Sequence, residues 1–199
     1  MLAFVDAPGF RITWQTEVGT LSAFEPTLAE VSQHAGSLAA GYNEPVNMPL
    51  LGHGEKITET EVVDHYEGMF EDKARPFLLF RDDKFVGDAD LRGIRDGACE
   101  FAFMIGAPSE QGKGLGTRFA IMINAFGFSQ LSLDRIFASI VPANVASRRV
   151  FDKLGYRVDD GELARTYADQ PGDITMVIDR PTFERVQLEV LGQLQIGMR

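Results

Sequence analysis

Cysteine is almost absent from this sequence, in which Cys99 is the only one among 199 residues. A single thiol excludes a disulfide within the chain, and we therefore expect a reducing compartment, the cytoplasm. The first ten residues, MLAFVDAPGF, have no basic segment and reach Asp6 before an apolar run, so we expect no secretory signal peptide. No later apolar run is long enough to cross a bilayer, and we expect no membrane partner.

Patterns typical of metal ligands are missing as well. The three histidines, His34, His53 and His65, lie in unrelated contexts without the spacing of a metal site. We therefore predict no bound metal. Cys99 falls within a predicted strand, where a buried apolar side chain is expected rather than a nucleophile, and this disfavours an acyl-cysteine mechanism.

Positive charge is in short supply. The chain has 19 Lys and Arg residues against 29 Asp and Glu residues, a formal net charge of -10. Binding to nucleic acid without sequence preference depends on neutralising phosphates, so we expect no nucleic-acid partner. A cationic or amine-bearing small molecule suits this charge, although a surface that only keeps the protein soluble explains it more simply.

The length and a composition of 45% hydrophobic and 24% charged residues predict one globular domain over residues 1–199. Thr27 and the pair Thr58 and Glu61 have the positions of helix N-caps. Hydrophobic periodicity predicts helices at 27–41, 58–72, 117–131, 144–155 and 181–194, and a long loop at 42–56. Alternation predicts strands at 10–15, 19–24, 76–81, 85–91, 98–105, 135–141 and 173–179. This order predicts an α+β fold with a mixed sheet.

Three glycines alternate with other residues in SEQGKGLGTRFA, residues 109–120, where a strand passes into a helix. The start of a helix attracts anions, and glycines let the preceding backbone turn its amides inward. Gly112, Gly114 and Gly116, with Lys113 and the hydroxyl of Thr117, therefore predict a phosphate or pyrophosphate site. The spacing fits neither a Walker loop nor a Rossmann loop, and a turn without a ligand stays the simpler alternative.

Two motifs together resemble a known family. QGKGLG, residues 111–116, matches the Q/R-x-x-G-x-G/A signature of the GNAT superfamily of N-acetyltransferases. NVASRRVFDKLGYR, residues 144–157, is similar to that family's second signature, which ends in L-G-[FY]. The sequence most resembles the branch with ribosomal-protein N-terminal and spermidine acetyltransferases. Residues 76–180 fit throughout and would carry the cofactor-binding core, whereas 1–75 fit only as acceptor-side helices around a variable loop.

The resemblance implies an α/β/α layered fold, with helices flanking a mostly antiparallel central sheet. It implies that acetyl-CoA is the acyl donor, with its pantetheine arm between the splayed strands 98–105 and 135–141. Asn144 would bond the pantetheine amides, or only cap its helix. The residues implied in binding acetyl-CoA are Met104, Ile105, Gln111, Gly112, Lys113, Gly114, Leu115, Gly116, Thr117, Asn144 and Phe151.

Transfer to an amine needs a base for the amine and an acid for the thiolate. Glu100 is the candidate base; facing solvent or pairing with a basic neighbour is the equal alternative. Many relatives carry tyrosine where this chain has Phe151, which cannot donate a proton. Ser147 is the nearest substitute on the same helix face, Tyr156 is a weaker one, and water or the amine itself is a further source.

We therefore expect an N-acetyltransferase that moves acetyl from acetyl-CoA to a primary amine, on a small molecule or a protein N-terminus, by direct attack in a ternary complex. The alternatives are a non-catalytic acyl-CoA binding module, which Phe151 keeps open, and the same fold using a longer acyl-CoA. Trp14, Tyr42 and Asn47 are candidates for the acceptor site. The acceptor and a homodimer are left open by the sequence.

Overall fold

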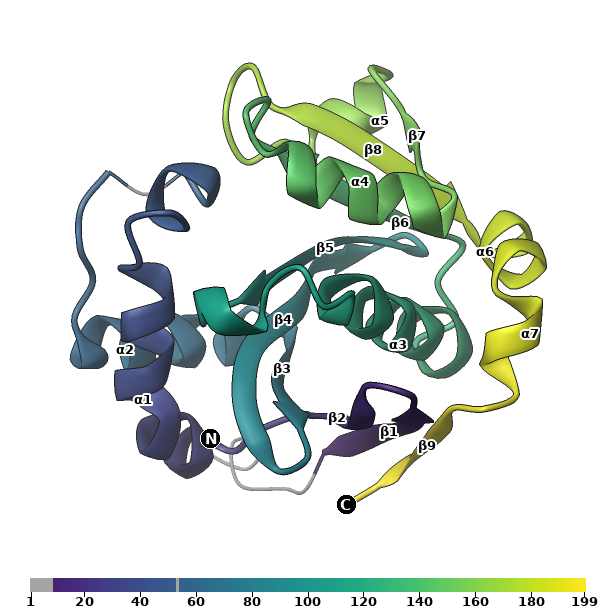
Figure 1. The fold of residues 1–199 in the computed structure, drawn as a ribbon. Coiled ribbons are helices and arrows are strands. Elements are labelled where there is room, and N and C mark those ends of the chain that lie inside the picture. The colour runs from purple at the N-terminus through teal and green to yellow at the C-terminus, as the bar shows by residue number, and fades with distance from the viewer. Residues whose placement is uncertain (1–8, 53) are drawn as a thin grey trace.

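The structure, a computed structural model, describes residues 9–52 and 54–199 (Figure 1). Most of the first ten residues, for which we expect no signal peptide, lie outside the described residues. His53, one of the three histidines considered as metal ligands, lies outside them too. Over the described residues, nine strands form one sheet in the order β7-β8-β6-β5-β4-β3-β2-β1-β9. All neighbours are antiparallel except β5 and β6, which are parallel. The predicted α+β class with a mixed, mostly antiparallel sheet is confirmed.

The strands of the sheet follow the predicted alternation closely in the first two thirds of the chain. They are β1 Phe10–Thr16, β2 Gly19–Phe24, β3 Arg75–Arg81, β4 Lys84–Arg95, β5 Ala98–Ile105, β6 Arg135–Ile140, β7 Arg157–Val158, β8 Ile174–Asp179 and β9 Gln195–Met198. The short turns before and after β4 contain residues with positive φ, Asp82, Asp83, Asp96 and Gly97. Such residues close hairpins, and β3, β4 and β5 form the predicted meander.

The helices begin where the sequence places capping residues. Thr27 and Glu30 form a capping box at the start of α1, and Thr58 and Glu61 form another at the start of α2. Asn144 caps α4, and Gly155 ends it with a left-handed conformation. The helices are α1 Leu28–Tyr42, α2 Glu59–Glu71, α3 Leu115–Gln130, α4 Val145–Leu154, α5 Glu162–Arg165, α6 Arg180–Val186 and α7 Leu188–Leu191, with 3-10 turns η1 Met48–Leu50 and η2 Pro108–Glu110.

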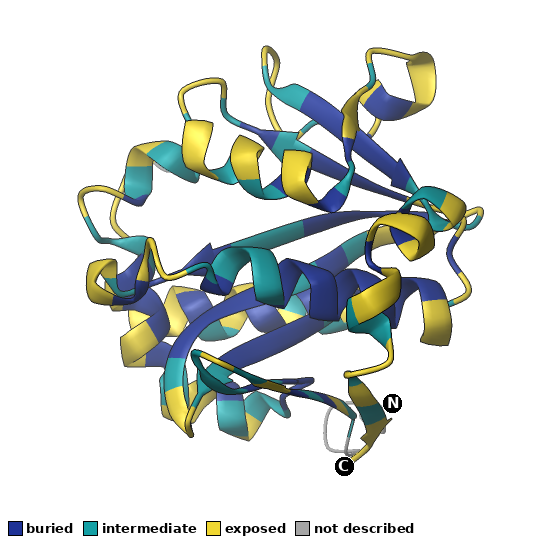
Figure 2. Cartoon of the chain, turned by 45° about the vertical axis from the view of Figure 1, so that its right-hand side comes forward, coloured by how far each residue is buried: buried dark blue, intermediate teal, exposed yellow. Residues whose placement is uncertain are grey.

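The sheet separates the two larger of three apolar clusters that the described residues form. The larger one surrounds α3, which is buried along most of its length, as its apolar sequence predicts. The smaller one packs α1 and α2 against the other face, with Tyr66 and Leu78 fully buried in it. Figure 2 shows the buried strands between exposed outer helix surfaces. The predicted layers are therefore present.

The prediction was wrong at the C-terminus. A helix was expected at 181–194, but the structure has two short helices, α6 and α7, followed by β9. Strand β9 pairs with β1, from Phe10 opposite Met198 to Thr13 opposite Gln195. Four residues carry little periodicity of their own, so this strand depends on pairing with a distant edge. The loop predicted at 42–56 contains the turn η1, and α3 begins at Leu115, two residues earlier than predicted.

Candidate functional site

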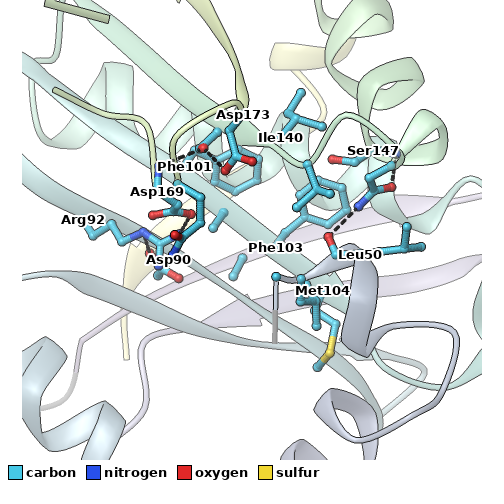
Figure 3. Close-up of a pocket in the computed structure, with 18 of the residues that line it drawn as sticks. Leu50, Asp90, Arg92, Phe101, Phe103, Met104, Ile140, Ser147, Asp169 and Asp173 are labelled. Carbon is cyan, nitrogen blue, oxygen red and sulfur yellow. Dashed lines mark hydrogen bonds and ion pairs between the residues drawn. The ribbon is translucent and has the colours of Figure 1, made fainter. Parts of the chain in front are cut away.

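Strands β5 and β6 separate after a short contact. Their parallel pairing covers only Ala98–Glu100 opposite Arg135–Phe137, so the rest of each strand diverges from the other. A cleft of about 340 Å³ opens between them and reaches the segment before α2 (Figure 3). The two strands therefore splay as the sequence analysis expected. The cleft is lined by Tyr42, Leu50, Leu51, Gly52, His65, Asp88, Ala89, Asp90, Arg92, Phe101, Ala102, Phe103, Met104, Ser139, Ile140, Val141, Asn144, Ser147, Phe151, Asp169, Gln170 and Asp173.

The glycine loop adopts backbone conformations that favour glycine. Gly112 and Gly114 have φ of 73° and 75°, and Gly114 is the N-cap of α3 without a side-chain cap. A Cβ on Gly114 would stand 2.5 Å from Nη1 of Arg118. A Cβ on Gly116 would stand 3.0 Å from the ring of Phe103, which lines the cleft. The loop therefore abuts the cleft and leaves the first amides of α3 without a capping side chain.

Gln111 anchors the loop to its surroundings. Its Nε2 donates to the carbonyl of Ile105 and to Oδ1 of Asn47, both at 2.9 Å. Asn47 is 6% exposed and donates from Nδ2 to the carbonyls of Gly41 at 2.8 Å and Gly106 at 3.0 Å. Asn47 was a candidate for the acceptor site, but here it joins the ends of α1 and β5 to the glycine loop.

Lys113 carries its charge beside a buried carboxylate. Its Nζ lies 3.3 Å from Oε2 of Glu110, which also pairs with Arg81 at 3.0 Å and Lys84 at 3.4 Å. Glu110 is 3% exposed, and these cations hold its pKa below the ordinary value despite burial. Three cations around one carboxylate leave this corner positive, as an anion site requires.

One face of α4 forms a wall of the cleft. Asn144, Ser147 and Phe151 all line it, as their spacing predicts. Oδ1 of Asn144 accepts from the amide of Ser147 at 3.0 Å, and Nδ2 donates to the carbonyl of Leu50 at 3.1 Å. Asn144 therefore caps its own helix and contacts the segment before α2. The ring of Phe151 packs edge-on against Phe101 at 5.9 Å.

The weaker acid candidate and one acceptor candidate lie in the core. Tyr156 is 5% exposed, its hydroxyl donates to Oδ1 of Asn124 at 2.6 Å, and it is absent from the described cleft lining. Trp14 is buried in the larger apolar cluster, with Nε1 donating to Gln193 at 3.1 Å. Cys99 is fully buried, and burial raises the pKa of its thiol.

Glu100 is held by a basic neighbour. Nη2 of Arg92 lies 3.1 Å from Oε1 of Glu100, and Nε lies 3.2 Å from Oε2. Arg92 also approaches Asp90 at 3.6 Å and Asp169 at 3.3 Å. Burial raises the pKa of Glu100 to about 7, although Arg92 lowers it. Glu100 is not among the described residues that line the cleft; it faces the neighbouring hollow by α2. Glu100 therefore pairs with a basic neighbour, which is one of the alternatives that the sequence leaves open for it.

Carboxylates that the sequence analysis did not single out lie in the cleft instead. Asp88 and Asp90 come from β4, and Asp169 and Asp173 come from the segment before β8. Figure 3 shows Asp90, Asp169 and Arg92 grouped together beside the phenylalanines of β5. Asp173 accepts from the hydroxyl of Ser139 at 2.8 Å. Alternating Asp-Ala-Asp in a strand is typical of a strand face that is exposed to solvent. The burial of Asp88 becomes visible only in the structure, where α1 and α2 pack against this face.

The described residues contain neither a metal-binding group nor a membrane-spanning helix. No group of three or more His, Cys, Asp or Glu side chains among them is arranged to hold a metal ion. Within the same residues, none of the helices has both the length and the apolar character to span a membrane.

Comparison with known proteins decides the family. The sequence profile of the acetyltransferase (GNAT) domain matches residues 27–157. The chain belongs to this GNAT family. Probable N-acetyltransferase YjcK of Bacillus subtilis is 33% identical over 110 residues, which are 53% of this chain and 58% of that protein. Spermidine N(1)-acetyltransferase of Escherichia coli is 31% identical over 110 residues, 54% of this chain and 58% of that protein.

Solved structures of GNAT proteins share the fold. RimJ of Mycobacterium smegmatis, determined in complex with CoA-disulfide, superposes with a TM-score of 0.67 over 94% of this chain and 97% of that one, at 16% identity. That likeness establishes the arrangement of the strands and helices. This GNAT chain spans little more than half the length of the two curated relatives. The activity proposed for it therefore depends on the residues of its own site.

Proposed function

We propose that this GNAT protein is an N-acetyltransferase that moves the acetyl group of acetyl-CoA to a primary amine by direct attack in a ternary complex. One observation carries the proposal. A glycine loop with left-handed Gly112 and Gly114, at the start of α3, adjoins a cleft between strands that stop pairing after Glu100. Such a loop offers amides to a pyrophosphate, and the unpaired strand edges offer backbone groups to an extended arm.

The residues of the loop fit coenzyme A. Amides from Gln111 to Thr117 would surround the pyrophosphate, with Lys113 adding positive charge. The arm would run between β5 and β6, past Met104, Ile105 and Phe151, with Asn144 beside it. A backbone amide on β5 would polarise the thioester carbonyl. Relatives support this donor, because the RimJ structure holds a CoA-disulfide.

The cleft favours a cationic acceptor. Its lining includes Asp88, Asp90, Asp169 and Asp173, and Arg92 is the one Lys or Arg residue among the described lining residues. Excess negative charge attracts an ammonium group and disfavours anionic acceptors. A relative named as a spermidine acetyltransferase is in keeping with an amine acceptor. Ser147, on the opposite wall, would give the departing thiolate its proton.

The proposal extends to the whole chain and to its location in the cell. We treat residues 1–199 as one acetyltransferase domain, with 76–180 carrying the acetyl-CoA site and 1–75 forming the acceptor side. We place the protein in the cytoplasm, a proposal that the single thiol supports. Neither nucleic acid nor a membrane is needed for the reaction.

One observation favours a second function. Phe151, which is 2% exposed and has no hydroxyl, lines the cleft, and the resemblance to the GNAT family implies tyrosine at this position in many relatives. A protein that only binds acyl-CoA would have the loop and Asn144 without any need for an acid. A thiol-release assay with acetyl-CoA and spermidine, kanamycin or an alanine-terminated peptide separates the two functions. Transfer to one of them supports the enzyme; tight CoA binding without transfer to any supports the binder.

A further inference from the structure

Asp88 occupies a particular place on the cleft wall. It lies on β4 directly opposite Met104, the last residue but one of β5. Opposite residues on antiparallel strands have side chains on the same face, with Cβ atoms about 5 Å apart. Asp88 is 5% exposed, and both residues line the cleft. A carboxylate is therefore held beside the strand edge where the thioester would lie.

The two oxygens of Asp88 have different surroundings. Oδ2 accepts hydrogen bonds from the hydroxyls of Tyr42 on α1 and Tyr66 on α2, the latter at 2.9 Å. Oδ1 is buried and has no hydrogen-bond partner among the described residues. Buried polar atoms in native proteins are nearly always paired, so an exception on a cleft wall points to a donor that binds in the cleft.

The groups around Asp88 tune its affinity for a proton. Tyr42 and Tyr66 lower its pKa by hydrogen bonding, whereas burial, the largest effect, and nearby Asp90 raise it. The pKa of Asp88 is about 6 as a result. Arg92 lies two residues further along β4, and His65 of α2 lines the same cleft. The carboxylate is therefore ionised at neutral pH, yet it binds a proton more tightly than an ordinary aspartate.

We propose that Asp88 is the general base of this protein, and that its Oδ1 accepts the proton of the acceptor ammonium, directly or through one water. The inference rests on the proposed function, because a base has a role only where an amine is acetylated. Glu100 is less well placed, since both its oxygens are engaged by Arg92 and it lies outside the described cleft lining.

The reaction then balances as follows. The ammonium gives one proton to Asp88, and the freed lone pair of its nitrogen attacks the thioester carbonyl carbon. The new N–C bond forms, the C–S bond breaks, and the thiolate takes the second amine proton through Ser147 or solvent. The products are the acetamide and the thiol, and Asp88 returns its proton to water. Tyr42 and Tyr66 are positioning residues, which hold Oδ2 of the carboxylate by hydrogen bonds and leave Oδ1 for the acceptor.

The first test compares Asp88→Asn with Asp160→Asn, the same change at an exposed aspartate beyond the cleft. The probes are the three acceptors named above, and the assay uses whichever the wild type acetylates fastest. We expect kcat/KM at pH 7 to fall by about 10²-fold or more for Asp88→Asn only. The deficit should shrink as the pH approaches the pKa of the acceptor amine. CoA affinity, measured by calorimetry, should stay within twofold.

The second test is the pH profile of Tyr66→Phe. Losing this hydroxyl removes a hydrogen bond that lowers the pKa of Asp88, so the acid limb of kcat/KM should move upward by about 0.5 pH unit or more. A purely structural Asp88 would leave the midpoint unchanged. This variant keeps the proposal testable even if Asp88→Asn does not fold.

The outcomes of the two tests either support or overturn the role of Asp88 as the base. An Asp88→Asn protein that keeps wild-type turnover, or a Tyr66→Phe profile with an unmoved acid limb, overturns the role of Asp88 alone. A wild type that binds CoA but acetylates none of the three acceptors overturns the proposed function, and the base with it.

Discussion

Arg92 and Glu100 face each other across β4 and β5 and form two hydrogen bonds, at 3.1 Å and 3.2 Å. Glu100 is buried and Arg92 is partly exposed, with 8% and 32% of their side chains accessible. A guanidinium that occupies both carboxylate oxygens leaves little room for a third partner. We therefore predict that Glu100, the base candidate of the sequence, serves a structural contact.

The first prediction concerns Glu100. Glu100→Gln keeps the shape of the side chain, and Arg92 retains Asp90 and Asp169 as partners. We expect turnover to change less than about threefold, since the group does not contact the acceptor. Steady-state kinetics measure this. A loss of about 10²-fold that recovers at high pH would instead make Glu100 the base.

The second prediction concerns the glycine loop. Gly114→Val places a branched side chain at a φ of 75°, where its Cβ would stand 2.5 Å from Arg118. We expect coenzyme A binding to be lost while the protein stays folded. Gly192→Val is the control, because no atom lies within 4 Å of a Cβ there and the φ of -68° is ordinary. Normal calorimetric affinity in Gly114→Val would show that the ligand does not use this loop.

The third prediction concerns the amide network beneath the loop. Asn47→Ala removes two hydrogen bonds to carbonyls and the contact with Gln111, which should lower the free energy of unfolding by about 1–3 kcal/mol. CoA affinity should fall too, because Gln111 loses its anchor. Asn43→Ala breaks two hydrogen bonds to Ile57 without touching the loop, so it should cost stability only. Equal affinities in the two variants would count against this link.

The fourth prediction is a pH dependence of stability. The pKa of Asp88 is about 6 in the folded chain, whereas the ordinary value, which applies to the unfolded chain, is 3.8. Between these two pH values the folded chain holds a proton that the unfolded chain has already lost. Stability must then fall as the pH rises from about 4 to 6, by about 3 kcal/mol for this group. Asp88→Asn should remove that part of the slope in urea titrations, and Asp160→Asn should keep it. Parallel curves for wild type and Asp88→Asn would refute the raised pKa.

Most strands and helices could be predicted because their signals are local. Thr27 and Thr58 carry capping boxes, and the meander alternates between marked turns. Strand β9 could not be predicted, since its four residues become a strand only by pairing with β1. The loop and α4 were recognisable as motifs. The environment of Asp88 was not, because its tyrosine partners lie 46 and 22 residues away in the sequence.

In the proposed reaction, acetyl passes from acetyl-CoA to an amine nitrogen. The most direct measurement is the mass of each acceptor, spermidine, kanamycin or the alanine-terminated peptide, after incubation with acetyl-CoA whose acetyl group is deuterated. We predict that the wild type adds one labelled acetyl group to at least one acceptor, with release of an equal amount of free thiol, and that Gly114→Val adds none. Unlabelled acceptors, with thiol release no faster than in buffer and coenzyme A bound normally, would contradict the account and identify a protein that binds acyl-CoA without transferring its acyl group.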